Sequence, residues 1–295
     1  MIVSKGPPDT GRCKRMTMGT ITKALEMLNF FSRTRANIGL GEFVKLTGRD
    51  KATVHRHLVE LEANGFLEQH PETRAYRLGS AILRLSAVRE TGIPFRAVVR
   101  PVVTELAEAV GELSHASLLQ GDVLSPVCHH DPMAHGTQVF FDESELLPLH
   151  ATASGHAVLA FSDPALLERV LVGKLEGYTP STPTDPGYLR SAVDEARRVG
   201  ISRIHRTFDD EVSSQGAPIF GPDGQVIGAL SVAVPVTRAM PDKLDMIRDA
   251  LFEAAGCITQ SLGGTHPSAD NRSPGHQRVS NPQWRARHTQ KTDTR

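Results

Sequence analysis

The apolar positions between Thr20 and Gly65 repeat with the spacing of short amphipathic helices, and they predict three of them. The first helix is expected to begin near Thr20, with an apolar face formed by Ile21, Ala24, Leu25, Leu28 and Phe31. A second helix is expected over 40–47, because Gly48 can end it. The third follows Asp50, a good N-cap, and its core face holds Val54, Leu58 and Leu61.

Two short strand patterns come directly after the third helix. Residues 66–69 and 75–78 are apolar at alternate positions and flank a polar turn. Three helices followed by a small hairpin are typical of a winged helix-turn-helix, which we place at 17–79. The helical pattern that begins at Ser80 predicts a linker helix over 80–92.

The apolar segments of the rest of the chain predict a larger α+β domain over 93–264. A helix is expected from Phe95, then a hairpin with strands over 116–119 and 123–130, and a further strand over 137–141. Later elements are expected as helices over 153–161, 164–172 and 186–199, strands over 201–207, 217–220 and 226–234, and a helix over 241–262. Hairpins interspersed with helices favour an antiparallel sheet over a doubly wound parallel one.

The formal net charge of the 295 residues is zero, but the charges are unevenly distributed. From Lys14 to Glu90 there are thirteen Lys and Arg against eight Asp and Glu, whereas residues 263–295 hold six Lys and Arg against two Asp. Both ends of the chain are therefore basic. Residues 1–16 and 265–295 have little apolar content, so we expect a disordered arm and a disordered basic tail.

The cysteine and hydropathy patterns bear on the compartment. Cys13, Cys128 and Cys257 are far apart in the sequence and form no CxxC pair, which argues against a disulfide framework. The sequence contains neither a long apolar run nor a secretory signal pattern at its N-terminus. We therefore expect a cytoplasmic protein without a membrane partner.

The outer side and N-terminal end of the third helix carry short or cationic residues, as a helix in the DNA major groove requires. Arg56 could bind guanine through its fork, Thr53 and Ala52 could contact thymine methyl groups, and Lys51 could reach a phosphate. His55 lies on the same side without an assigned role. In the wing, Arg74 and Arg77 are candidates for phosphate or minor-groove contacts, whereas Tyr76 suits wing packing. The alternative is a solvated helix face with incidental charges.

Three blocks of the sequence resemble the signature segments of the IclR family of bacterial transcriptional regulators. They are the region 39–79, PLHATASGHAVLA at 148–160, and APIFGPDGQVIGALSVAVP at 217–235. The resemblance covers about Met18 to Gly264. It implies a winged helix-turn-helix, a linker helix and a GAF-like effector-binding domain. It also implies homodimers or dimers of dimers on palindromic operator DNA, whose binding a small organic or aromatic acid modulates.

Two features of the larger domain suggest where a small molecule binds. The segment His150–Gly155 turns into a helix, whose first N–H groups could face an anion, and serine hydroxyls lie on or beside the last strands. The family pattern, carried over residue by residue, implies a pocket formed by Ala153, Ser154, Asp209, Ser214, Ser231 and Ala233. The short segment between Asp209 and Ser214 leaves open whether both reach one pocket, and His156 replaces a lysine that is usual in the family.

Three other interpretations compete with this one. Cys128, His129, His130 and Asp131 could suggest a metal site, but adjacent residues of a strand point to opposite faces. Ser154 with His150 and His156 could suggest a hydrolase, but there is no nucleophile-elbow motif. The basic tail could suggest an architectural DNA-binding protein. We expect a regulator that is not an enzyme and has no cofactor or metal.

Overall fold

The computed structural model describes residues 19–92 and 95–265, which form two compact units. One unit ends at Val88 and the other begins at Arg89, so the division falls within helix α4 (Ser80–Gly92). This helix occupies the range in which the linker helix is expected. The expected arm over 1–16, and all but the first residue of the expected tail, lie outside the described residues.

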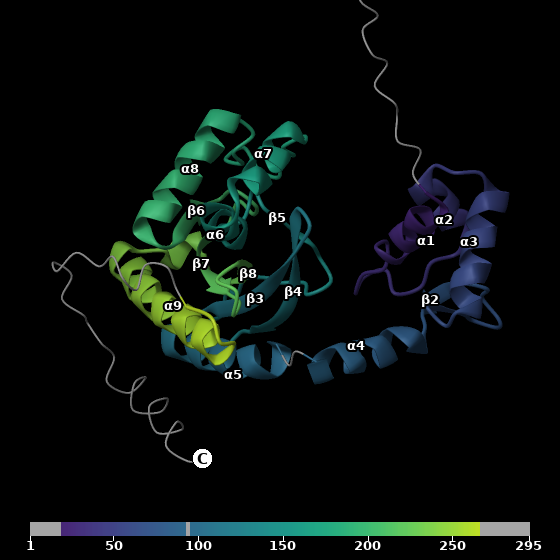
Figure 1. Ribbon diagram of the computed structural model, residues 1–295, viewed down its shortest axis with the longest axis horizontal. Coiled ribbons are helices and arrows are strands. Elements are labelled where there is room, and N and C mark those ends of the chain that lie inside the picture. The colour runs from purple at the N-terminus through teal and green to yellow at the C-terminus, as the bar shows by residue number, and fades with distance from the viewer. Residues whose placement is uncertain (1–18, 93–94, 266–295) are drawn as a thin grey trace, which may run out of the picture. The chain divides into compact units, whose positions relative to one another are not determined.

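The N-terminal unit has the helix and strand order of a winged helix-turn-helix (Figure 1). Its elements are α1 (Thr20–Leu28), α2 (Leu40–Thr47), α3 (Lys51–Ala63), β1 (Leu67–Gln69) and β2 (Tyr76–Leu78). Phe43 of α2 is fully buried, and its ring packs edge-on against Phe31, 5.8 Å away, and against Tyr76, 6.4 Å away. Tyr76 thereby joins the wing to the helices, which is the packing role expected for it.

The C-terminal unit is built on a six-stranded antiparallel sheet with strand order β5-β4-β3-β8-β7-β6. Its strands are β3 (Leu113–Gln120), β4 (Val123–His130), β5 (Leu147–Pro148), β6 (Ser202–His205), β7 (Val212–Phe220) and β8 (Val226–Pro235). Strands β4, β7 and β8 each contribute buried residues to the hydrophobic cores on both sides of the sheet. The α+β class expected from the sequence is confirmed.

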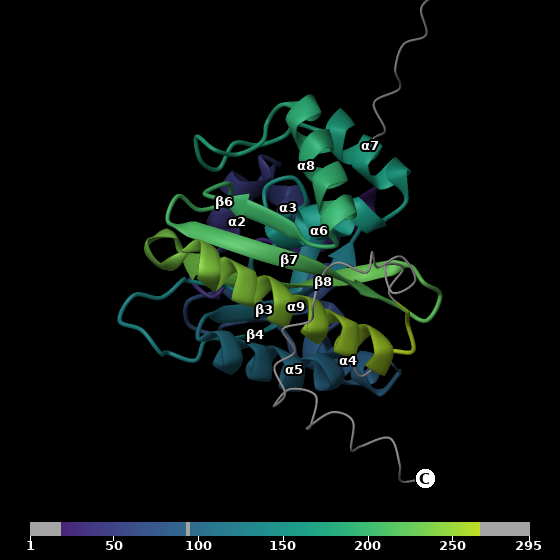
Figure 2. The ribbon, with the colours of Figure 1, turned by 90° about the vertical axis from the view of Figure 1, so that its left-hand side faces the viewer.

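Helices cover both faces of this sheet (Figure 2). On one face pack α5 (Phe95–Val110) and α9 (Pro241–Ser261), and the 3-10 turn η1 (Val236–Arg238) precedes α9. On the other face pack α6 (Ala153–Phe161), α7 (Pro164–Val172) and α8 (Pro186–Val199). Successive residues of β8 alternate between the two sides, because side chains in a strand point to opposite faces. Leu230, Val232 and Val234 belong to the α5–α9 core, whereas Ala229 belongs to the α6–α8 core.

The strand expected over 137–141 is wrong: residues 131–146 form an irregular loop between β4 and β5. The apolar run Val139-Phe140-Phe141 is not part of the sheet. Instead, the Phe141 ring stacks on the His115 ring of β3, with 4.4 Å between the centroids. Phe141 thus packs on a side chain above the sheet rather than within a ladder of backbone hydrogen bonds, whereas Phe140 is 83% exposed.

Gly155 allows α6 to begin directly against the preceding segment. A Cβ at this position would lie 2.3 Å from the carbonyl oxygen and 2.5 Å from the Cα of Leu149. We expect Gly155→Ala to lower the free energy of unfolding by about 2 kcal/mol, because backbone atoms must move to accept the methyl group. Thermal or urea unfolding of the full chain measures this loss.

Gly256 of α9 is the matched control, because a Cβ there would meet no atom within 4 Å. Gly256→Ala should raise the free energy of unfolding by up to about 1 kcal/mol, as expected for replacing glycine inside a helix. Equal effects of the two substitutions would contradict the close packing of Gly155.

Candidate DNA-binding helix and ligand cavity

The first turn of α3 is fixed by its N-cap. The Asp50 carboxylate accepts a hydrogen bond from the Thr53 N–H at 2.8 Å, and the same interaction lowers the pKa of Asp50. The cap satisfies one of the N–H groups that a helix leaves without a partner. The helix therefore begins at Lys51, and its first turn carries Lys51, Ala52 and Thr53.

The two faces of α3 separate the core from the candidate DNA contacts. Val54, Leu58 and Leu61 are buried, whereas Lys51, Ala52, His55 and Arg56 are exposed and Thr53 is half-buried. Arg56 forms no ion pair with the other described residues, so its guanidinium is available to a ligand. This arrangement meets the requirement for a groove-binding helix, although it does not by itself distinguish DNA contact from a solvated face.

His57 is a core residue of α3 that the spacing of apolar residues did not predict. It is only 3% exposed, and its Nε2 has no hydrogen-bond partner within the described residues. Burial, followed by the charges of Arg56, Arg49 and Lys23, lowers the pKa of His57. The ring is therefore neutral near pH 7. A buried histidine next to an exposed arginine gives no distinct sequence signal, because histidine is found both buried and exposed in proteins.

The two candidate arginines of the wing differ in their surroundings. Arg74 lies in the exposed turn before β2 with a left-handed backbone (φ 58°). Arg77 is exposed, but it donates to Glu68 at 2.9 and 3.1 Å. Glu68 also accepts from the Ser80 N–H at 3.2 Å, where α4 begins. A phosphate contact by Arg77 would therefore compete with Glu68, whereas Arg74 forms no ion pair with the rest of the described chain.

All six residues expected to form the pocket line one cavity of about 280 Å³ in the C-terminal unit. These residues are Ala153, Ser154, Asp209, Ser214, Ser231 and Ala233. Asp209 and Ser214 border the same space although only a short segment separates them in the sequence. The volume is close to that of small-molecule sites in proteins.

The floor of the cavity is the face of the sheet opposite α5 and α9. Ser231 of β8 pairs with His115 of β3 on one side and with Gly216 of β7 on the other. In the next row, Ala233 pairs with Ser214. Ser231, Ala233 and Ser214 have small side chains and Gly216 has none, so the sheet leaves room above its centre. The larger residues of these rows lie to either side, His115 and Leu113 on β3 and Ile204 on β6.

Ser231 has an unusual environment for a buried hydroxyl. The residue is 1% exposed, and its Oγ has no hydrogen-bond partner within the described residues. An unpaired buried hydroxyl costs about 1 to 3 kcal/mol relative to a paired one. Its position on the cavity floor means that a ligand could supply the missing partner.

The N-terminus of α6 forms a second wall. The Thr152 hydroxyl caps the helix by accepting from the Gly155 N–H at 3.1 Å. The N–H groups of Ala153 and Ser154 belong to the first turn, where a helix provides no partner of its own. Gly216 permits this approach, since a Cβ there would lie 2.6 Å from the carbonyl group of Ala153. Hydroxyl and N–H donors therefore meet at the deep end of the cavity.

The β4–β5 loop covers the cavity with Val139, Phe140 and Phe141. Phe141 stacks on His115, which is 6% exposed. Burial, together with the charge of His129, lowers the pKa of His115 to about 3, so its ring is neutral at physiological pH. These loop residues and His115 were not predicted as pocket residues. The apolar run in the loop was the available signal, but it was assigned to a strand.

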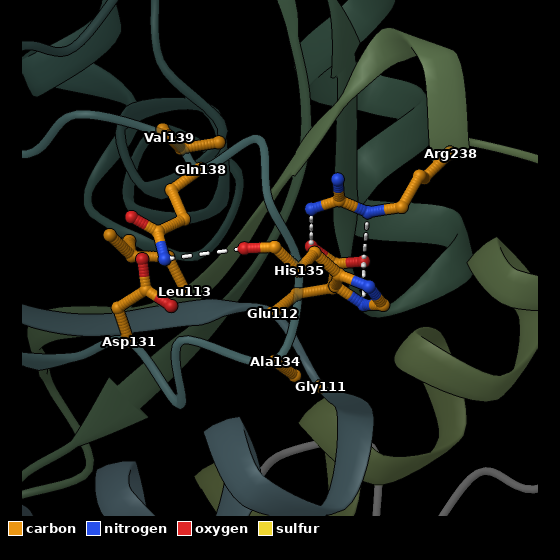
Figure 3. A pocket seen from close by; sticks show the side chains of 9 residues that line it. All are labelled: Gly111, Glu112, Leu113, Asp131, Ala134, His135, Gln138, Val139 and Arg238. Atoms are coloured by element: carbon orange, nitrogen blue, oxygen red, sulfur yellow. Dashed lines mark hydrogen bonds and ion pairs between the residues drawn. The ribbon is translucent and has the colours of Figure 1, made fainter.

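One anchor of this loop is a buried ion pair (Figure 3). Arg238 of η1 donates to both carboxylate oxygens of Glu112 at 3.0 and 2.8 Å, and Glu112 is 3% exposed. The same guanidinium donates to the carbonyl oxygen of Thr137 in the loop at 2.9 Å. Val139, two residues later, borders both this small pocket and the large cavity.

The second anchor lies on the other side of the aromatic run. Glu143 accepts from the backbone N–H of His129 at 3.1 Å, and its carboxylate lies 2.8 Å from Nδ1 of the same residue. Arg96 of α5 lies 3.5 Å from the other carboxylate oxygen. Residues 138–142 are therefore held between two polar attachments, and this fixes the wall that faces the cavity.

The arrangement of the described residues supports neither a metal site at His129 and His130 nor a serine–histidine pair at Ser154. The Nε2 of His130 contacts Glu108, and His129 contacts Glu143, so the adjacent histidines use different partners. Over 19–92 and 95–265, no three His, Cys, Asp or Glu side chains are grouped to hold a metal. Ser154 Oγ lies 3.4 Å from Thr152 Oγ1, whereas Nε2 of His156 contacts a backbone carbonyl oxygen. A serine–histidine pair is thus not formed.

Comparison with known proteins agrees with both units. Residues 20–71 match the family model for the IclR helix-turn-helix domain, and residues 87–260 match that for the bacterial transcriptional regulator IclR C-terminal. The chain is 30% identical to the HTH-type transcriptional regulator BhcR of Paracoccus denitrificans over 241 residues, which cover 80% of this chain and 84% of that one.

Solved structures show the same fold. A crystal structure of a putative IclR transcriptional regulator from Silicibacter is 43% identical, with a TM-score of 0.79 over 84% of this chain and 98% of that chain. An IclR homologue from Microbacterium hydrocarbonoxydans, complexed with 4-hydroxybenzoate, is 24% identical, with a TM-score of 0.68 over 83% of this chain and 99% of that chain.

The architecture is that of a DNA-binding transcriptional regulator with a helix-turn-helix and an effector-binding domain. The chain belongs to the IclR family. Its relatives are named as regulators and repressors, and the protein is a regulator rather than an enzyme. Within the described residues, no helix combines the length and apolar character needed to cross a membrane.

Loss of the Arg238 anchor should loosen the cavity wall. We expect Arg238→Gln to lower the free energy of unfolding by about 2 kcal/mol, because Glu112 stays buried without its bidentate partner. Hydrogen exchange in residues 135–142 should become faster, since the bond to Thr137 is lost too. Exchange measured by mass spectrometry tests this.

Arg190 provides the control, because it also contacts both oxygens of a carboxylate, Glu168, but on an exposed surface. Arg190→Gln should change the free energy of unfolding by less than about 1 kcal/mol. Unchanged exchange of residues 135–142 in Arg238→Gln would show that the ion pair does not hold the loop.

Proposed function

We propose that this protein binds a palindromic operator as a homodimer or a dimer of dimers, and that a small organic or aromatic acid in the cavity controls this binding. The observation that carries the proposal is the unpaired, buried Ser231 hydroxyl on the floor of a cavity lined by all six expected residues. A ligand carboxylate would satisfy this hydroxyl and accept from the first N–H groups of α6.

The expected acid has an aromatic or apolar body. Phe140, Phe141, Tyr178 and Phe208 border the cavity and provide apolar area for it. The complex of the Microbacterium relative with 4-hydroxybenzoate supports a ligand of this size and kind. Asp209 would accept a hydrogen bond from a ligand hydroxyl, because a carboxylate has no proton to donate to a second acid at neutral pH.

On DNA, we place α3 in the major groove. Arg56 would read guanine, Thr53 and Ala52 would contact thymine methyl groups, Lys51 would contact a phosphate, and His55 would lie on the same side. Arg74 and Arg77 would contact the backbone or minor groove beside the wing. One small domain of this kind buries little DNA surface, so two copies are needed for specific affinity.

Exposed apolar side chains support self-association. Leu83 of α4 and Ile21 of α1 are 75% and 76% exposed, and Leu85 and Leu25 add to the apolar surface of the same two helices. Such side chains on helices are commonly covered by a second subunit. We also place the protein in the cytoplasm, where its DNA partner is found and where Cys128 and Cys257 would stay reduced.

Control by an acid requires that the ligand bind more tightly to one DNA-binding state than to the other. Helix α4 is our candidate for the connection, because it contains the boundary between the two units. Reciprocity then demands that operator DNA change the affinity for the acid by the same factor.

We expect Arg56→Ala to weaken binding to an operator, selected from a random duplex library, by at least about tenfold, because a bidentate contact to guanine is lost. Fluorescence anisotropy measures the change. Arg198→Ala on the exposed surface of α8 is the control and should leave the affinity unchanged. If Arg56→Ala retains the base preference of the original protein, α3 is not the reading element as proposed.

Substitution of Ser231 should have opposite effects on stability and on ligand binding. Ser231→Ala removes an unpaired buried hydroxyl, so the free protein should gain about 1 kcal/mol of stability. The same change should weaken binding of 4-hydroxybenzoate about tenfold, because the ligand loses a hydrogen bond. Thermal unfolding and calorimetric titration provide the two measurements.

Ser213→Ala is the matched control on the neighbouring strand, because the Ser213 hydroxyl already donates to the carbonyl oxygen of Ile204 at 3.1 Å. This substitution should reduce stability and leave ligand affinity unchanged. Reduced stability of Ser231→Ala with unaltered affinity would refute the role of Ser231, and acids that bind without changing operator affinity would refute the control mechanism.

A further inference from the structure

The cavity combines aromatic rings with negative charge at its exposed end. Asp142, Glu145 and Asp209 all line it, whereas none of the described lining residues is lysine or arginine. His115 supplies no positive charge, since its pKa of about 3 keeps the ring neutral. A simple carboxylic acid would therefore enter a site whose charged side chains all repel it.

The acidic residues surround the mouth, not the floor. Glu145 and Asp209 are exposed and Tyr178 is 42% exposed, whereas Ser231 at the floor and Ser154 in the wall formed by α6 are each 1% exposed. The ring of Tyr178 lies against that of Phe208, with 4.9 Å between centroids, and Phe208 directly precedes Asp209. Aromatic rings and carboxylates thus meet at one end, and donors meet at the other.

The charges at the mouth also influence one another. Burial and the charge of Asp142 raise the pKa of Glu145, and burial with the charges of Glu176 and Glu145 raises that of Tyr178. In both cases burial raises the pKa most, and the neighbouring carboxylates raise it further. A positively charged ligand group would relieve this repulsion and would also interact with the electron-rich faces of Tyr178 and Phe208.

We infer that the effector is a zwitterion, in which an ammonium group lies at the mouth among Tyr178, Phe208, Glu145 and Asp209, and a carboxylate lies at the floor beside Ser231 and the start of α6. The inference rests on the proposed function, because it assumes that the cavity is the effector site. It adds the positive group, which neither the family resemblance nor the six expected residues imply. The Ser231 hydroxyl, which has no hydrogen-bond partner within the described residues, independently indicates that a polar group of the ligand binds at the cavity floor.

Two probes of the same shape test the positive group. Calorimetric titration of the full-length protein with 4-(aminomethyl)benzoate and with 4-ethylbenzoate compares acids in which an ammonium group replaces a methyl group. We expect the amino acid probe to bind about tenfold more tightly, the combined size of a cation–π contact and a charge attraction at a partly exposed site.

Substitutions at the mouth should remove this preference. Glu145→Gln together with Asp209→Asn should bring the two affinities within about twofold, and Glu195→Gln on the exposed part of α8 should leave the preference intact. The asparagine still accepts the hydrogen bond that Asp209 receives from the Glu211 N–H at 2.8 Å, so the local turn is kept. Thermal unfolding verifies that the double variant is folded.

The outcomes separate this inference from the proposed function. Equal binding of the two probes, or a preference that persists in the double variant, overturns the zwitterion but leaves an acid effector. Failure of 4-(aminomethyl)benzoate to bind also overturns it. Binding of either probe that survives Ser231→Leu, which fills the cavity floor, would instead place the ligand elsewhere and contradict the proposed function.

Discussion

The alternation of side chains along β8 is the constraint on which the C-terminal unit depends. Leu230, Val232 and Val234 fill the core beneath α5 and α9, so the residues between them must face α6. Those residues are Ser231 and Ala233, and both are small, as is Ala229 before Leu230. A larger residue at Ser231 or Ala233 would fill the space that now forms the cavity. One strand therefore defines both the core and the ligand site.

The sequence predicted the regular elements well because their patterns are local. Helices α6, α7 and α8 follow from spacing and N-caps, and each begins and ends where the pattern indicates. The loop over 131–146 could not be predicted in this way. Its shape depends on Arg238, about a hundred residues later, and on Glu112, which lies before β3. Such long-range attachments leave no periodic signal, so the run Val139–Phe141 resembled a strand.

In the candidate sites, too, residues on regular elements were predictable from the sequence, whereas residues brought together by loops were not. The family pattern named five residues that the sheet and α6 position at the floor and walls, and a sixth, Asp209, at the mouth. The rings and carboxylates of the mouth lie on loops, at Phe141, Glu145, Tyr178 and Phe208, and only their packing brings them together. On α3, spacing separated the core from the exposed face but did not identify His57 as buried. The Arg77–Glu68 pair likewise became visible only through the register of β1 and β2.

A ligand in this cavity would act on parts of the structure that are already held firmly. The floor belongs to the sheet, and the loop above it is attached through Glu112 and Glu143, so little order has to be created when a ligand binds. The exception is Phe140, which is 83% exposed although it borders the cavity. A ligand that covers this ring removes apolar surface from water, and Phe140 lies between the two anchors of the loop. Part of the binding free energy would therefore come from covering this ring, and a ligand controls DNA binding only if its total binding free energy differs between the two DNA-binding states.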